Sequence, residues 1–277
     1  MKSIVLATDF SHPANQAAQT AARLAQSWQC ELILLNAYRF WPTNPAETGD
    51  FPLSSQAMHD SSLHALRELA HQLHGQIGPD LPIRCMAREG YTRTVINDVA
   101  IAEQAELLVM ATVGSAPQSA QLMGSVATDM VAETRVPLLL LPPDSPLTSV
   151  ENAALAISID TPPDALTLEA ALTFARRFGC TVHGLCVHDE TDTPAVAHRI
   201  AQLRTLLERQ GHTLTVLPDT DTSGQLLYET LLHAAQARQA DLLMMLPQPH
   251  NWIRNLFVEG ETQRVARLST LPLLAVV

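Results

Sequence analysis

Short apolar runs alternate with longer amphipathic stretches along the first half of the chain. The runs have the length of strands, and the apolar residues in the stretches between them recur at helical spacing. The predicted strands cover residues 4–7, 30–37, 82–86, 106–110 and 137–141, and the predicted helices cover residues 12–28, 55–73, 92–103 and 125–133. Near-continuous apolar strands that alternate with helices are typical of a parallel sheet covered on both faces. The pattern predicts a doubly wound, Rossmann-like α/β domain with five parallel strands.

Much of this pattern occurs twice. Residues 105–110 (AELLVM) recur as 240–245 (ADLLMM), and residues 136–139 (VPLL) recur as 271–274 (LPLL), both at an offset of 135. Near the start of the repeat the offset is 151, because a predicted strand at 153–159 leads to Asp160 as the first strand leads to Asp9. Most of the difference is assigned to a loop at 41–52 that the second copy lacks. We expect two domains, at 1–143 and 153–277, joined by a linker at 144–152.

The composition restricts the partners of the chain. The 277 residues carry a formal net charge of -11, and Lys2 is the only lysine, which argues against bulk binding to nucleic acid or to an anionic membrane. No apolar run is long enough to span a membrane, and the first one stops at Asp9, too early for a secretory signal. The 4 cysteines lie mostly in predicted strands, where a free thiol behaves as a small apolar group. We therefore expect a cytoplasmic protein.

Candidate chemistry follows the first and fourth predicted strands. Gly114 lies just after the fourth strand, and Gly124 and Ser125 open the next helix. Backbone amides at a glycine turn and at a helix N-terminus favour an anion, and Ser125 adds a hydroxyl donor. Asp9 faces the same crevice, where ligands bind in a doubly wound sheet. The structural alternative is that Gly114 is an ordinary turn and Ser125 an ordinary helix cap.

The order and spacing of these residues resemble the nucleotide signature of the universal stress protein family. That signature is glycine, two residues, glycine, nine residues, glycine and then serine or threonine, after the fourth strand. Gly114, Gly124 and Ser125 match three of its four fixed positions, and Ala111 replaces the first glycine. The segment 7–11 (ATDFS) is similar to the family's first strand and its aspartate. The resemblance extends over nearly the whole chain, as two domains in tandem.

The resemblance implies a fold, a ligand and a set of binding residues. The fold is that of the adenine nucleotide alpha hydrolase-like proteins, with the two domains paired about a pseudo-twofold axis and a homodimer of chains left open. The ligand is ATP or the related AMP or ADP, with Mg²⁺ as a companion ion. The implied binding residues are Thr8, Asp9, Ala37, Met110, Ala111, Gly114, Gly124, Ser125 and Val126.

Two positions depart from the family pattern. Ala111 costs little if its backbone angles are ordinary, but roughly 1 kcal/mol or more if they are left-handed. Ser115 stands where the family often has a basic residue. Both departures predict modest phosphate affinity.

The corresponding loop of the second half, at 246–260, has a different composition. Pro247 and Pro249 remove amide donors, and Glu259 places a negative charge where phosphates would lie. No nucleotide is expected in the second domain. For Asp160 the favoured interpretation is the cap of a helix beginning near Pro162.

Other catalytic and metal patterns fit less well. The single lysine excludes a P-loop, and no hydrolase elbow of the Gly-x-Ser-x-Gly type occurs. His183, Cys186 and His188 have a zinc-like spacing, but on a strand only Cys186 and His188 share a face. We expect a core strand with a surface histidine and no metal. No catalytic residue is assigned, and the expected activity is at most slow ATP hydrolysis.

The favoured hypothesis is a stress-response protein whose first domain binds an adenine nucleotide and thereby changes an interaction with an unidentified protein partner. The alternative from another class is a nucleotide-free interaction scaffold, which Ala111 and Ser115 favour. A third hypothesis, an adenylating enzyme such as a ligase or sulfurtransferase, is disfavoured by the missing lysines and by the lack of a catalytic cysteine pair.

Overall fold

The structure is a computed structural model of the chain, and it describes residues 2–40, 54–114, 125–145, 147–159, 162–188, 193–218, 225–246 and 271–277. The chain divides into two compact units, Met1–Pro146 and Leu147–Val277. This division falls inside the segment 144–152, for which a linker is predicted. The loop predicted at 41–52 lies outside the described residues, and so does the loop predicted at 246–260 except for Leu246.

The first unit contains a five-stranded sheet in the order β3-β2-β1-β4-β5, and every strand pair in it is parallel. This confirms the predicted fold class. Its elements are β1 (Ser3–Ala7), α1 (His12–Ser27), β2 (Glu31–Tyr38), α3 (Ser55–Ile77), β3 (Ile83–Glu89), α4 (Thr92–Ala102), β4 (Ala105–Ala111), α5 (Ser125–Glu133) and β5 (Leu138–Leu141).

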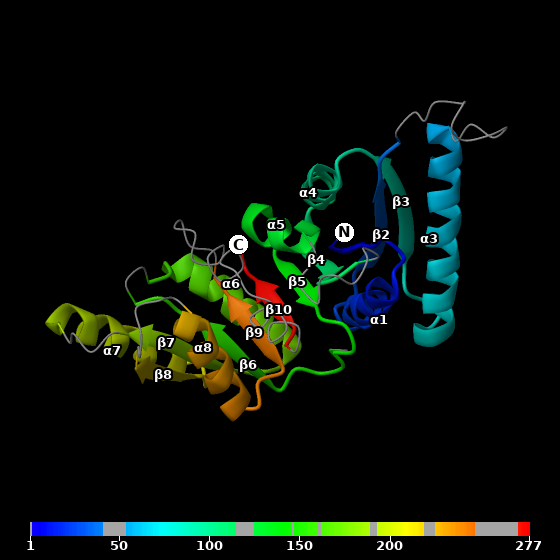
Figure 1. Ribbon diagram of the computed structural model, residues 1–277. Helices are drawn as coiled ribbons and strands as arrows, with labels where there is room; N and C mark the ends of the chain where they lie inside the picture. The colour runs from blue at the N-terminus through cyan, green and yellow to red at the C-terminus, as the bar shows by residue number, and fades with distance from the viewer. Residues whose placement is uncertain are drawn as a thin grey trace. The chain divides into compact units, whose positions relative to one another are not determined.

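Helices cover both faces of this sheet. Figure 1 shows α1 and α3 on one side and α4 and α5 on the other, and each of these helix pairs is in contact. The central strands β1, β2 and β4 are consequently buried on both faces, with Ile4, Leu34 and Leu108 fully inaccessible to solvent. The buried face of α1 consists mostly of alanines, whose small side chains let the helix lie close to the sheet. Burial on both faces explains why the strands read as continuous apolar runs.

The second unit has the same strand order, β8-β7-β6-β9-β10, again with parallel pairs. Helix α6 packs on β7, α7 on β8, and α8 on β6 and β7. Its elements are β6 (Asn152–Ala156), α6 (Ala165–Phe178), β7 (Thr181–His188), α7 (Pro194–Glu208), β8 (Thr213–Pro218), α8 (Gln225–Ala237), β9 (Leu242–Met245) and β10 (Leu273–Ala275).

Asp160 lies outside the described residues, but the helix start and the strand end on either side of it differ from expectation. The helix that follows β6 begins at Ala165, and its N-cap is Asp164, whose carboxylate accepts a hydrogen bond of 2.7 Å from the Thr167 amide. The first strand of the second unit also ends earlier than expected, at Ala156. The residue two positions beyond this end, as Asp9 is two positions beyond β1, is Ser158 and not Asp160.

The two units differ most between their second strand and the helix that follows it. Sixteen residues (39–54) connect β2 to α3, whereas five (189–193) connect β7 to α7. Helix α3 has 23 residues, four more at its C-terminus than predicted, and α7 has 15. None of the helices within the described ranges is both long and apolar enough to cross a bilayer.

Candidate functional site

The strand order of the first unit reverses between β1 and β4. From β1 the chain proceeds to β2 and β3 on one side, and then returns to β4 and β5 on the other. The carboxyl ends of β1 and β4 therefore lie side by side with diverging loops, which is where open α/β sheets bind ligands. Asp9 follows β1, and Gly114 follows β4, so both lie at this edge.

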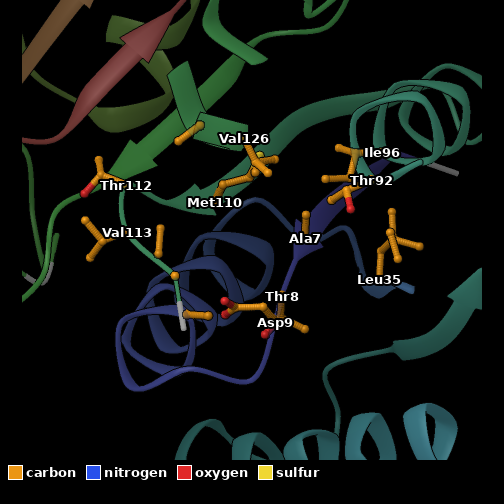
Figure 2. Close-up of a pocket in the computed structure, with 15 residues that line it drawn as sticks. Ala7, Thr8, Asp9, Leu35, Thr92, Ile96, Met110, Thr112, Val113 and Val126 are labelled. Atoms are coloured by element: carbon orange, nitrogen blue, oxygen red, sulfur yellow. The ribbon is translucent and has the colours of Figure 1, made fainter. Parts of the chain in front are cut away.

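A cavity of about 280 Å³ opens at this edge. Figure 2 shows Met110 and Val126 on one side of it, Thr92 and Ile96 from α4 on another, and Thr8 and Asp9 at the end of β1. The lining is mostly aliphatic, with hydroxyl groups from three threonines and one carboxylate. An apolar pocket with a few convergent polar groups suits a small ligand that has both an aromatic and a polar part.

Asp9 and Gly114 approach each other closely across the mouth of this cavity. A Cβ atom added to Gly114 would lie 2.5 Å from the Asp9 Oδ2 atom. The backbone of Gly114 is not left-handed, so the glycine is required for this approach rather than for its backbone angles. The arrangement joins the two loops of the switch point through one carboxylate.

The turn after β1 holds Asp9 in place. The Phe10 amide donates to Thr8 Oγ1 at 3.0 Å, and the Ser11 amide donates to Asp9 Oδ1 at 3.0 Å. Phe10 itself has a φ of 62°, a left-handed conformation that costs a bulky residue about 1–3 kcal/mol. Ser11 then caps α1 by accepting a hydrogen bond from the Ala14 amide. These contacts fix the carboxylate against the cavity.

A series of buried, hydrogen-bonded polar groups lies next to the cavity, between the ends of β1 and β2 and helix α3. Ser62 in α3 donates to Asn36 Oδ1 at 2.7 Å, and Asn36 Nδ2 donates to the Thr8 carbonyl at 2.8 Å. All three residues are buried. These hydrogen bonds link the ends of β1 and β2 to α3. They therefore set the distance between Thr8 and Ala37, both of which line the cavity.

The structure brings seven of the nine predicted binding residues together around the cavity. Of the other two, Gly124 lies outside the described residues, and Ser125 begins α5 with a side chain that is also outside them. The seven are Thr8, Asp9, Ala37, Met110, Ala111, Gly114 and Val126.

Ala111 has ordinary backbone geometry. It is the last residue of β4, pairs in register with Leu141, and is absent from the positive-φ residues of the described chain. An alanine here therefore carries no left-handed strain, and this departure from the glycine signature costs little.

Sequence reasoning missed the other half of the lining. Thr92 and Ile96 lie one turn apart on α4, and this spacing is the one signal that could have placed them on a common face. Their position over the cavity depends on the crossover after β3, which the local sequence does not encode. The missed lining residues are Ala7, Ala14, Leu35, Thr92, Ile96, Thr112, Val113 and Ala127.

Thr112 provides an unused hydrogen-bonding group. The residue is 6% exposed, and its Oγ1 atom has no hydrogen-bond partner among the described residues. Buried hydroxyls normally have a partner, and because this oxygen is itself sealed from solvent it is not exposed to the open cavity.

His183 and Cys186 of β7 make other contacts, and the side chain of His188 lies outside the described residues. His183 contacts Thr213 Oγ1 at 2.9 Å and Asn152 Oδ1 at 3.2 Å, so it is not a simple surface histidine. Cys186 is buried, and burial raises the pKa of its thiol to about 11. Within the part of the chain that the structure describes, no three histidine, cysteine or acidic side chains gather in a way that could hold a metal ion.

Comparison with known proteins gives both sequence and structural matches. The model of the universal stress protein family matches residues 1–142. A universal stress protein of Thermus aquaticus, in the QAH/OAS sulfhydrylase 3' region, is 31% identical over 142 residues, which are 50% of this chain and 98% of that protein.

Two solved structures match over both units. A universal stress protein from Archaeoglobus fulgidus DSM 4304 has a TM-score of 0.69 at 15% identity and covers 99% of this chain and 95% of its own. A putative universal stress protein from Pseudomonas aeruginosa UCBPP-PA14 has a TM-score of 0.62 at 17% identity, with coverages of 99% and 92%. These likenesses show the fold, and the family match covers more than half of the sequence. The chain belongs to the universal stress protein family.

Proposed function

We propose that the first unit binds an adenine nucleotide in the cavity between β1 and β4, and that binding controls an interaction with a protein partner during stress. One observation carries the proposal. Seven of the nine residues that the family resemblance implies for nucleotide binding, although far apart in the sequence, line one cavity at the switch point of the sheet. Ligand binding there would favour one conformation of the loop after β4, and so change the surface that a partner contacts.

The cavity offers each part of an adenine nucleotide a chemically suitable contact. The aliphatic walls formed by Ile96, Met110 and Val126 suit the flat base. The Asp9 carboxylate can accept hydrogen bonds from ribose hydroxyls. The amides at the start of α5 suit a phosphate, with Mg²⁺ as a companion ion when the ligand is ATP.

We assign no catalytic role to this site. Among the described residues that line the cavity, Asp9 is the only titratable side chain. A carboxylate next to bound ATP, without a partner acid or a cation in the lining, supports at most slow hydrolysis.

We also propose that the second unit is a second domain of the family that does not bind nucleotide in this manner. Directly after β6, the position equivalent to Thr8 is Ile157, since the amides of both residues donate to the equivalent carbonyls, Leu35 and Leu185. Ile157 is apolar and buried, and the position after it is Ser158 instead of an aspartate. Pairing of the two domains about a pseudo-twofold axis and a homodimer of chains stay predictions.

Calorimetric titration of nucleotide-stripped protein with ATP, ADP and AMP tests the proposal. The expected stoichiometry is one site per chain, and ligand at 100 times its dissociation constant should stabilise the first unit by about 2.7 kcal/mol. Ala37→Phe, which fills the cavity from the end of β2, should abolish binding. The same change at the exposed Ala195 of α7 is the control and should leave binding intact.

The alternative function is a nucleotide-free scaffold. It is favoured by the scarcity of positive charge around the cavity, since no lysine or arginine lines it among the described residues. It predicts neither heat nor thermal stabilisation with any of the three nucleotides, and it would then place function on the protein surface.

A further inference from the structure

The charge around the cavity of the first unit is one-sided. Asp9 is the only charged side chain among the described residues that line it. The described residues at the end of β4 and the start of α5, 110–114 and 125–127, include neither a basic nor an acidic residue. Among the described lining residues, an anion would therefore meet one carboxylate and neutral groups.

The cations nearest in sequence to the lining already have partners. Arg93, next to Thr92, forms ion pairs with Asp129 at 3.1 Å and with Glu133 at 2.9 Å. Arg39, two residues after Ala37, stacks on the Tyr91 ring with its guanidinium carbon 4.2 Å from the ring centre. Turning either arginine toward a phosphate would break these contacts.

The single lysine lies at the other end of the sheet. Lys2 precedes β1 and pairs at 2.6 Å with Glu106, near the start of β4. The cavity is at the carboxyl ends of the same two strands. Lys2 is therefore separated from the cavity by the length of β1 and cannot contact a ligand there.

This inference rests on the proposed function and narrows it. We propose that the cavity binds adenosine or AMP, which carry little or no phosphate charge, more tightly than ADP and ATP. The Asp9 carboxylate accepts hydrogen bonds from donors such as ribose hydroxyls. It repels phosphate oxygens, because both groups are negatively charged. Each phosphate adds negative charge near Asp9, and none of the described lining residues is a cation that would offset it, so affinity falls as phosphates are added.

Titration of nucleotide-stripped protein with adenosine, AMP, ADP and ATP, in EDTA and at constant ionic strength, tests this selection. The expected affinity of ATP is at least about tenfold below that of adenosine. Raising the salt concentration should narrow the difference, because screening weakens the repulsion without affecting the neutral ligand. If ATP, with or without excess Mg²⁺, binds as tightly as adenosine or more tightly, the inference is wrong. If none of the four binds, the proposed function itself fails.

Two variants separate charge from shape. Asp9→Asn keeps the oxygen that accepts from the Ser11 amide and removes the charge, so it should reduce the adenosine-to-ATP preference several-fold. Val113→Lys places a cation in the lining and should raise ATP affinity about tenfold relative to adenosine affinity. Val113→Gln is the matched control and should leave the preference as it is. An unchanged preference in both charge variants would overturn the inference.

Discussion

The two units have one strand order and nearly the same strand register, yet their ligand edges differ. The amide of Leu108 donates to the Pro137 carbonyl, and the amide of Leu243 donates to the Pro272 carbonyl, an identical bond 135 residues later. At the carboxyl edge, the first unit has the buried polar chain through Asn36. The second unit has Cys186 at the register position of Asn36.

The difference shows that the same sheet architecture carries different side chains at equivalent strand-end positions. Strand pairing and burial need only apolar side chains on both faces, and both units provide them. A ligand cavity also needs polar groups held at the strand ends. In the second unit, Asp241 accepts hydrogen bonds from the amides of Glu151 and Asn152 at the start of β6, and Arg199 donates to the Ile159 carbonyl beyond its end. These contacts differ from the buried polar series of the first unit.

The largest expected effect concerns Asn36. Asn36→Leu would leave the Thr8 carbonyl and the Ser62 hydroxyl buried without their partners, and should destabilise the first unit by about 3 kcal/mol. Urea unfolding followed by hydrogen exchange and mass spectrometry measures each unit separately. Adding Ser62→Ala removes one orphaned group and should restore about 1 kcal/mol.

The matched change in the second unit is Cys186→Ala. It removes a small apolar group and a weak sulfur contact with the Thr215 carbonyl, and should cost about 1 kcal/mol. Equal costs for Asn36→Leu and Cys186→Ala would show that the polar chain contributes no more than ordinary packing.

Glycine substitutions should separate stability from binding. A Cβ at Gly184 would lie 2.8 Å from Leu207 Cδ1 and 2.9 Å from Leu214 Cδ1, so Gly184→Ala should destabilise the second unit by about 2 kcal/mol and leave nucleotide affinity unchanged. Gly114→Ala should displace Asp9 and lower the affinity of the first unit for its preferred nucleotide about tenfold, or about 1.4 kcal/mol.

Gly75 provides the control for these glycine variants. It lies in α3 with no atom within 4 Å of an added Cβ, so Gly75→Ala should stabilise the first unit by about 0.5–1 kcal/mol without changing affinity. A drop in affinity in Gly75→Ala similar to that in Gly114→Ala would contradict a local role for the contact between Gly114 and Asp9.

Most of the fold could be predicted from the sequence, because buried parallel strands must be apolar along their whole length. The 135-residue repeat even anticipated the shared register of the last two strands in each unit. The helix cap was predicted wrongly because Asp160 and Asp164 both precede possible helix starts, and only the position of the first turn distinguishes them.

The site was only half predictable for a different reason. Residues next to strand ends, such as Asp9, are placed by the strand pattern itself. Thr92 lines the cavity through a crossover, and the contact between Asn36 and Ser62 joins two elements whose distance depends on how α3 packs. The need for glycine at position 114 comes from the Asp9 side chain, 105 residues earlier in the chain. No local pattern contains these relations.

Mild acid should distinguish the two units with a smaller effect. Burial lowers the pKa of His212, and Arg176 acts in the same direction, while His212 Nδ1 accepts a hydrogen bond of 3.2 Å from the Val182 amide. Burial likewise lowers the pKa of His183. Because the unfolded chain then binds more protons than the folded one, the second unit should lose stability as pH falls below about 6.5.

In the first unit, a carboxyl group with a lowered pKa loses its charge only at a lower pH than these histidines gain theirs. The hydrogen bond from Arg84 lowers the pKa of Glu103, so its contribution is complete above the usual glutamate pKa and is lost only as the pH falls through the lowered value. Between pH 7 and pH 5 the second unit should therefore weaken by about 1 kcal/mol, roughly the hydrogen bond that protonated His212 cannot accept, while this pair in the first unit remains intact. Urea unfolding with hydrogen exchange at both pH values measures this.

His212→Asn keeps an acceptor but does not titrate, and should reduce the pH dependence of the second unit, whereas His198→Asn on the exposed face of α7 should preserve it. If the first unit weakens before the second on mild acidification, the buried histidines of the second unit do not set the order in which the two units lose stability.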